Sequence, residues 1–372
     1  MKRLELVTDL TAICDNAREI RRRVDPSAAL LCVVKADAYG HGALQVARAL
    51  ENQKLADAFA VATPAEGEKL VQEGGLTKPV VVLGLPCGEE DAALSVENGL
   101  HQAIESVSEA EMLDRAAAKR GMRAKVHIKL DTGMHRIGVS SEPQLDALLS
   151  AMKTFKNVDV TGLFTHFCAA DEDEAFTLEQ KERFARMRAA VHKAGFTPVC
   201  HAAASTAMLK SGFAYDMVRA GIALYGTGVK ELKGVVRPAQ TLLSGVISLR
   251  RIAKGETVGY SRRFTAPRDS LIATVPCGYG DGYPRILSGR ADVLIEGKRA
   301  PIVGNVCMDM LMADVSDIPD VKKGSPVVLL GKMGQEVITP DELAEKAGTI
   351  PYEIMLGFSG RVQRSWIKLQ EG

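Results

Sequence analysis

Short apolar segments alternate with amphipathic stretches over the first 220 residues of the chain. Apolar residues in the amphipathic stretches, such as Ser108–Arg120 and Thr177–Ala194, recur at helical spacing. Buried strands separated by helices are typical of a parallel sheet, so this alternation constrains the fold more than any other feature. The eight predicted strands are 29–35, 57–62, 79–84, 101–105, 125–130, 160–166, 198–202 and 217–220.

The alternation favours an α/β fold with a closed (β/α)8 barrel, or TIM barrel, preceded by a helix at Leu10–Val24. A doubly wound open sheet stays an alternative, because the number of strands does not prove that the sheet closes. In both architectures a ligand binds at the carboxyl ends of the strands. The residues that follow each strand are therefore the candidate site residues.

The pattern changes near Pro238 to short segments rich in β-branched residues and punctuated by glycine. Only one helix is predicted after this point, at Pro340–Lys346, where Pro340 and Asp341 suit a helix start. We therefore predict a barrel domain over residues 1–235 and a mainly β domain over residues 236–372. The predicted strands of the second domain are Val246–Leu249, Leu271–Val275, Val293–Glu296, Ala300–Val306 and Pro326–Leu330.

Composition narrows the classes of partner. The 372 residues carry a net charge of +1 without a basic tract, which argues against a nucleic acid or an anionic membrane as partner. The seven cysteines lack metal-ligand spacing and suggest reduced thiols, so no metal is expected. No window approaches the roughly 20 uninterrupted apolar residues of a membrane span, and the first residues lack the apolar core of a signal peptide. These features predict a soluble cytoplasmic protein.

Lys35 stands at the carboxyl end of the first predicted strand, after the apolar run Ala29–Val34. Desolvation at such a rim favours the neutral amine, which is a nucleophile. Tyr39 follows Lys35 by four residues, and its hydroxyl can reach the phosphate of a ligand that Lys35 binds. Gly40 and Gly42 allow the backbone to approach a ligand. An ordinary strand-to-helix junction with a surface lysine is the alternative that these residues leave open.

Several segments of the chain resemble motifs of the alanine racemase family, in the family's order and over almost the whole chain. Each motif is weak alone, but together they are specific. The segments are VVKADAYGHG at 33–42, HIKLDTGMHRIG at 127–138, GETVGYS at 255–261, CGYGDGY at 277–283 and VGNVCMD at 303–309. The resemblance implies an isomerase that uses pyridoxal 5'-phosphate (PLP) to interconvert L- and D-alanine, and so supplies D-alanine for peptidoglycan.

The resemblance also implies which residues bind the cofactor. Lys35 would carry it as a Schiff base, and Arg219, supported by His166, would bond the pyridine nitrogen. A guanidinium does not readily hand over a proton, so this nitrogen would stay unprotonated and the ring would be a weaker electron sink. Return of the proton to Cα is then favoured over transamination. The implied phosphate ligands are Tyr39, Ser205, Tyr352 and the backbone amides of Gly221 and Ile222.

Racemisation needs a proton donor on each face of the substrate carbanion, and the resemblance assigns Lys35 and Tyr260 to these roles. It assigns Arg136 to the cofactor phenolic oxygen and the substrate carboxylate. For Lys129 two states stay open: a carbamate that orients Arg136, or a solvated lysine at the rim. The residues implied for the substrate side are the Met308 amide, Asp309 and Tyr279. With Tyr260, these would come from the second subunit of a head-to-tail homodimer with shared active sites.

Three positions depart from the family pattern. Ala204 replaces a common asparagine next to the phosphate, Ser261 replaces the glycine after the tyrosine, and Asn305 replaces an arginine, which suggests a less tightly gated entrance. A serine or broad-specificity racemase is the alternative within the class. A PLP-binding homeostasis protein without catalysis would lack the β domain and Tyr260. Arg219 counts against a decarboxylase, and the motifs after residue 255 count against both a decarboxylase and an aldolase.

Overall fold

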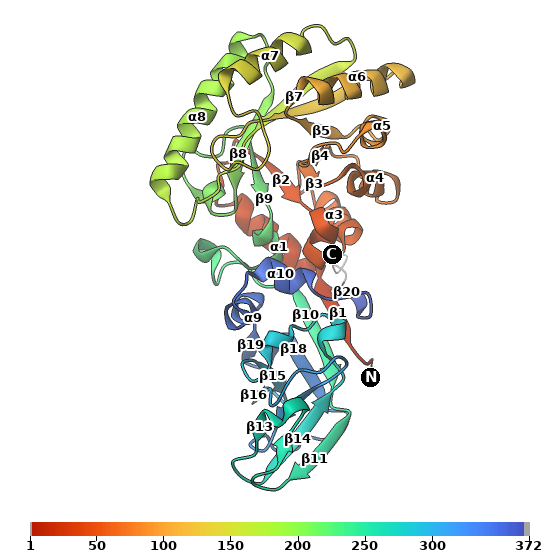
Figure 1. Ribbon diagram of the computed structural model, residues 1–372, viewed down its shortest axis with the longest axis vertical. Helices are drawn as coiled ribbons and strands as arrows, with labels where there is room; N and C mark the ends of the chain where they lie inside the picture. The colour runs from red at the N-terminus through yellow and green to blue at the C-terminus, as the bar shows by residue number, and fades with distance from the viewer. Residues whose placement is uncertain (1, 368–372) are drawn as a thin grey trace.

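A closed parallel barrel forms the first part of the protein in this computed structural model, which describes residues 2–367 (Figure 1). All eight predicted strand segments are barrel strands, and the closure of the sheet excludes the doubly wound alternative. The barrel strands are β2 (Ala29–Val33), β3 (Ala58–Val61), β4 (Val80–Val82), β5 (His101–Ile104), β6 (Ala124–Lys129), β7 (Val158–Phe164), β8 (Val199–Ala204) and β9 (Met217–Ala220).

Helices cover the outside of the barrel, and local sequence explains where several of them begin. Thr63 with Glu66, and Ser106 with Glu109, form capping boxes that satisfy the first backbone N–H groups of α4 and α6. The helices are α1 (Leu10–Arg21), α2 (Lys35–Gly40), α3 (Ala43–Asn52), α4 (Pro64–Gln72), α5 (Glu89–Glu97), α6 (Val107–Arg120), α7 (Glu142–Met152), α8 (Glu174–Lys193), α9 (Pro340–Ala347) and α10 (Pro351–Leu356). None of the helices in residues 2–367 is long and apolar enough to cross a membrane.

The second part of the protein is mainly β, as predicted. Its largest sheet has seven strands, in the order β16-β15-β18-β10-β1-β20 with β19 paired to β18. A three-stranded sheet, β11-β14-β17, and the β12-β13 pair extend it away from the barrel (Figure 1). The strands are β10 (Gln240–Gly245), β11 (Ser248–Ile252), β12 (Thr257–Val258), β13 (Phe264–Thr265), β14 (Ser270–Val275), β15 (Asp292–Ile295), β16 (Lys298–Pro301), β17 (Leu311–Asp314), β18 (Pro326–Met333), β19 (Glu336–Ile338) and β20 (Gln363–Ile367).

The first strand of the chain belongs to this second sheet. β1 (Glu5–Asp9) pairs antiparallel with β10 and parallel with β20, and Leu6 lies opposite Leu242. Asp9 ends β1 and accepts a hydrogen bond from the Ala12 N–H, so α1 of the barrel begins where β1 stops. The chain therefore crosses between its two parts near residue 9 and again near residue 239. The division at residues 235 and 236 stays a prediction, which did not foresee this placement of residues 5–9.

Three local predictions for the second part were wrong. A second helix, α10, follows α9, because Pro351 suits a first helical turn. The predicted strand 246–249 is displaced: residues 246 and 247 lie between β10 and β11, and the strand itself begins at Ser248 and continues to Ile252. The segment 300–306 pairs only as far as Pro301, apart from an isolated bridge at Ile302. Short strands of this kind depend on pairing partners far away in sequence, which local patterns do not reveal.

Gly162 on β7 makes room for the buried His127 ring of β6. A Cβ at position 162 would lie 2.2 Å from His127 Nδ1, far closer than packed atoms approach. We expect Gly162→Ala to lower the free energy of unfolding by about 1–3 kcal/mol, as overpacking of a core does. Urea unfolding measures the change. Gly360→Ala is the control, since a Cβ there meets nothing within 4 Å, and equal stability of the two variants would contradict the prediction.

Candidate active site

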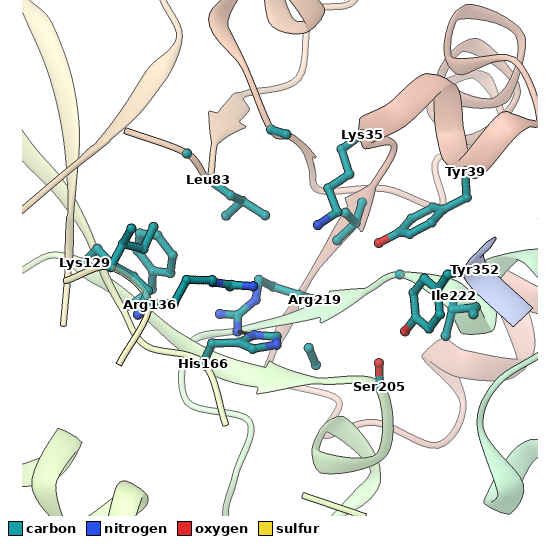
Figure 2. A pocket seen from close by; sticks show the side chains of 17 residues that line it. Lys35, Tyr39, Leu83, Lys129, Arg136, His166, Ser205, Arg219, Ile222 and Tyr352 are labelled. Carbon is teal, nitrogen blue, oxygen red and sulfur yellow. Dashed lines mark hydrogen bonds between the residues drawn. The ribbon is translucent and has the colours of Figure 1, made fainter. Parts of the chain in front are cut away.

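A cavity of about 350 Å³ opens at the carboxyl ends of the barrel strands (Figure 2). It brings together side chains from positions that span more than 300 residues of sequence. Nine residues predicted to bind the cofactor, together with Lys129, line it: Lys35, Tyr39, Lys129, Arg136, His166, Ser205, Arg219, Gly221, Ile222 and Tyr352. The closed barrel thus brings the predicted residues together in one site.

The cavity is strongly basic. Lys35, Lys129, Arg136 and Arg219 line it, and no carboxylate is among the described lining residues. Apolar side chains, including Leu83, complete the wall. A concave site with four basic groups and an apolar wall suits an anionic ligand that has a flat apolar body.

Lys35 enters the cavity from an unusual turn. The four residues that follow it, Ala36–Tyr39, have φ between 50° and 55°, so α2 is one left-handed turn and not an ordinary helix. Left-handed conformation costs roughly 1–2 kcal/mol for each residue that has a Cβ. The turn places the Lys35 amine and the Tyr39 hydroxyl on the same side of the cavity (Figure 2). Side chains from other elements must therefore stabilise it.

Residues of the second sheet hold the far end of this turn. Gln240 on β10 donates to the Gly40 carbonyl oxygen at 2.8 Å, and Arg364 on β20 donates to the same atom. Trp366 Nε1 donates to the His41 carbonyl oxygen at 2.7 Å. These three residues were not predicted from the sequence, because each lies some 200 residues or more from the turn. The second part of the protein therefore shapes the lysine-bearing turn of the barrel.

The near end of the turn is held by Glu66, which was also missed. Its carboxylate accepts from the Ala36 N–H at 2.7 Å and from the Ala62 N–H at 2.7 Å. Burial, followed by the charge of Arg136, lowers the pKa of Lys35, and the charge of Glu66 opposes this shift. The neutral amine is therefore populated at lower pH than for an exposed lysine.

Arg219 lies across the floor of the cavity, and both of its terminal nitrogens donate hydrogen bonds to protein groups. Nη1 donates to His201 Nδ1 at 3.0 Å and to the His201 carbonyl oxygen at 3.1 Å. Nη2 donates to His166 Nδ1 at 2.9 Å and to the carbonyl oxygens of Thr165 and Ala202 at 2.9 and 2.7 Å. The Nε–H makes no hydrogen bond with a residue that the structure describes. This group is therefore available to a ligand in the cavity.

Burial, and then the nearby Arg136, lowers the pKa of Arg219 to about 9, so the guanidinium is still charged at neutral pH. Burial and the charge of Arg219 hold the pKa of His166 and of His201 well below the usual range, so both rings are neutral. Each ring therefore accepts from Arg219 through an unprotonated Nδ1. The predicted support of Arg219 by His166 is present as a contact, and His201 is a second support that sequence analysis missed.

Three hydroxyl groups gather on the other side of the cavity. Figure 2 shows the hydroxyls of Tyr39, Ser205 and Tyr352 facing a common space, away from Arg136 and His166. The Tyr39 and Tyr352 rings pack with centroids 5.6 Å apart. Burial raises the pKa of both tyrosines, so they are neutral hydrogen-bond donors. With the Gly221 backbone nearby, this cluster suits a phosphate.

Lys129 is buried beside the arginines and donates from Nζ to the Leu130 carbonyl oxygen at 2.7 Å. Burial, and then the charge of Arg219, lowers its pKa to about 7. Asp131 is turned toward backbone N–H groups of residues 133–135, and these hold its pKa low although burial opposes them. The structure therefore places a partly neutral buried amine next to the cationic cluster, and not a solvated lysine.

Four predicted residues are absent from this cavity. Tyr260, Met308 and Asp309 line a separate hollow of about 630 Å³ on the second part of the protein. Tyr260 is 72% exposed, Met308 52% and Tyr279 41%. This region, near β11 and β14, lies at the opposite end of the molecule from the barrel (Figure 1). One chain alone does not assemble the two predicted bases.

Asn305 packs against the turn that carries Tyr260, and its effect on the gating of an entrance shared between two subunits stays a prediction. It is only 5% exposed, and its Nδ2 donates to the Tyr260 carbonyl oxygen at 2.9 Å. The two residues that follow Tyr260, Ser261 and Arg262, have φ of 58° and 50°. Asn305 therefore holds the strained turn on which Tyr260 is displayed.

Comparison with known families supports the resemblance over both parts of the chain. Residues 8–228 match the N-terminal domain of alanine racemases, and residues 239–366 match the C-terminal domain. An alanine racemase of Geobacter sulfurreducens is 42% identical over 371 residues, which cover 96% of each chain. One of Halothermothrix orenii is 39% identical over 96% of this chain and 95% of the other.

Solved structures agree with these sequence matches. An alanine racemase of Clostridium difficile superposes with a TM-score of 0.91 at 33% identity, over 99% of this chain and 96% of the other. One from Streptomyces coelicolor gives a TM-score of 0.92 at 34% identity, over 99% and 98% of the two chains. The similarity therefore extends to the arrangement of both parts.

Proposed function

Since the chain belongs to the alanine racemase family, we propose that it interconverts L- and D-alanine with PLP bound in the barrel cavity. In this role it supplies D-alanine for peptidoglycan in the cytoplasm. The observation that carries the proposal is the cavity itself, where a desolvated lysine faces a cluster of three hydroxyls and a buried arginine. These groups would bind the cofactor and supply one of the two bases that such a reaction requires.

The donor set of the cavity fits PLP. The Lys35 amine would hold the aldehyde carbon covalently, and Tyr39, Ser205 and Tyr352 would bind the phosphate together with the Gly221 and Ile222 amides. A Cβ at position 221 would lie 3.2 Å from the Tyr39 hydroxyl, so a side chain there would crowd the phosphate site. The free Nε–H of Arg219 would donate to the pyridine nitrogen. When bound, PLP supplies a ring that withdraws charge from the amino-acid Cα.

Residues of the protein determine where the substrate Cα proton is removed and returned. Arg219 donates a hydrogen bond but stays protonated at neutral pH, because its pKa is about 9. This limits how much charge the ring draws away and favours return of the proton to Cα. Lys35 takes or gives the proton on one face, and Tyr260 does so on the other. Arg136 would bind the substrate carboxylate, with the Met308 amide, Asp309 and Tyr279 completing the substrate side.

We propose a head-to-tail homodimer with shared active sites. Within one chain Tyr260 and Met308 are exposed and lie away from the Lys35 cavity, which leaves that cavity without its second base. A second copy would bring Tyr260 of the partner subunit to the cavity mouth and cover these apolar side chains. Reciprocal contacts of this kind follow naturally from two-fold symmetry.

Measurement of Cα-hydrogen exchange in D2O tests the proposed function. Purified protein is incubated separately with L-alanine, L-serine and a larger amino acid, and deuterium incorporation and the D-isomer are followed. We expect both with alanine. The serine arm is informative because small changes in side chain are worth only about 1–3 kcal/mol of discrimination. Bound PLP without exchange on any substrate would instead identify a PLP carrier, and a preference for serine would identify a serine racemase.

We propose that Lys129 carries a carbamate, which would neutralise the cationic cluster around Arg136. Only the unprotonated amine attacks CO2, and a pKa of about 7 makes that form accessible at neutral pH. The ¹³C signal of a carbamate, measured with ¹³C-bicarbonate, should therefore rise as pH increases through about 7. Lys129→Ala should remove the signal. Lys125→Ala is the control on the same strand, where the side chain is exposed, and loss of the signal there would contradict the assignment.

A further inference from the structure

A row of three histidines runs through the barrel interior beneath Arg219. His201 on β8 accepts from Arg219 through Nδ1, and its Nε2 lies 3.0 Å from His127 Nδ1 on β6. His127 Nε2 lies 3.2 Å from His101 Nδ1 on β5. We call these residues, His101, His127 and His201, the histidine row. The row connects the floor of the cavity with a half-buried position at the first residue of β5.

The hydrogen atoms of the row can be placed by elimination. A guanidinium only donates, so His201 Nδ1 must be unprotonated. A neutral imidazole has one donor and one acceptor, so His201 Nε2–H donates to His127 Nδ1. By the same argument His127 Nε2–H donates to His101 Nδ1, to which the Thr161 hydroxyl, at 3.0 Å, also lies close. All the rings therefore share one tautomer, with their lone pairs directed toward Arg219.

The packing around the row is built for these rings. His127 and His201 are buried, and the Phe164 ring stacks on His201 at 4.8 Å with an interplanar angle of 4°. Gly162 provides the space for His127, and the pairing of β6 with β7 shifts register between Val126 and His127. A ring that fills a space left by glycine beside a register shift is a specific feature and not general core packing.

The row also compensates the charge of Arg219. This buried guanidinium forms no ion pair with a carboxylate of the described residues, and a buried charge without compensation is costly. Burial lowers the pKa of His127 to about 3 and of His101 to about 4, so both rings remain neutral at physiological pH. Aligned neutral imidazoles place partial negative charge at Arg219, and a protonated ring would reverse this effect.

We propose that His127 and His101 are positioning residues for the racemase: they hold His201 in the Nε2–H tautomer, which fixes Arg219 and leaves its Nε–H for the ligand. The inference rests on the proposed function only for what Arg219 does once it is held. Loss of the His127 ring would leave the His201 Nε2–H without an acceptor. His201 could then adopt the other tautomer, in which Nδ1–H faces the guanidinium and repels it.

The test uses ring ¹⁵N chemical shifts of the ¹⁵N-histidine-labelled full-length protein with PLP bound. Seven histidines make selective labelling practicable. We expect unprotonated Nδ1 and protonated Nε2 for all three rings of the row at pH 7. In His127→Leu we expect a mixture of tautomers at His201, a shifted absorbance band of the bound cofactor, and a kcat about ten-fold lower with little change in KM. His127→Gln should restore these readouts, because its amide both accepts and donates.

Phe184→Leu is the matched control, since it truncates a fully buried ring outside the row and should lower stability without altering tautomers or kcat. A protonated Nδ1, or a cationic ring, within the wild-type row would overturn the proposal. The proposal would also be overturned if His127→Leu kept both the kcat of the wild type and the wild-type tautomer of His201. The expected tautomers in a protein that racemises no amino acid would support the row and refute the proposed function, so the two failures are distinct.

Discussion

Replacement of Lys35 by alanine is expected to lower racemisation by about 10³-fold or more, because it removes both the covalent cofactor link and one of the two bases. The stability of the protein should change little or rise, since burial of this amine is unfavourable, as its lowered pKa shows. Turnover of L-alanine and thermal unfolding measure the two effects. Borohydride reduction followed by mass spectrometry should find the cofactor attached to the wild-type chain but not to the variant.

Chemical rescue separates the role of the Lys35 amine from a structural role. Methylamine added to Lys35→Ala should restore part of the activity, because a free amine can enter the vacated space and accept a proton. Lys125→Ala is the control, since Lys125 is exposed on the outside of β6 and should behave like the wild type. Undiminished activity of Lys35→Ala would refute the assignment of this residue as nucleophile and base.

Mixing of Lys35→Ala with Tyr260→Phe chains should restore activity that each variant alone lacks. In a mixed dimer with shared sites, one cavity has Lys35 from one chain and Tyr260 from the other. Random exchange makes half of the dimers mixed, with one of two sites complete, so we expect roughly a quarter of wild-type activity. Alone, Tyr260→Phe should lose proton transfer on one face only, and Cα-hydrogen exchange from L- and D-alanine measured separately should reveal which.

A chain that carries both substitutions is the control for this experiment, because mixing it with either single variant produces no complete site. Absence of restored activity with full subunit exchange would show that Tyr260 acts within its own chain or not at all. Equal exchange rates from both enantiomers in Tyr260→Phe, at the wild-type level, would contradict the two-base assignment. The exposed position of Tyr260, distant from the cavity of its own chain, is the reason to expect complementation.

Much of the barrel could be predicted because its pattern is local. Alternation of apolar and amphipathic segments depends on residues close in sequence, and all eight barrel strands were located in this way. The end of the first barrel strand also indicated Lys35, whereas Arg136 and Arg219 were assigned by the family resemblance; parallel strands in a barrel end on the same face, which brings such residues into one site. The bounds of the short strands in the second part were predicted less accurately, because the pairing partners of these strands are distant in sequence.

The amino-acid sequence by itself determined which chemical groups the protein carries at its strand ends, and the family that those groups identify. Only the tertiary structure decided how these groups are held. The left-handed turn that presents Lys35 depends on Arg364, which is 324 residues away from its partner Gly40. The histidine row depends on ring positions that β5, β6 and β8 acquire only when the barrel closes. Contacts of this kind leave no periodic pattern, because they arise from packing between distant segments and not from neighbours along the chain.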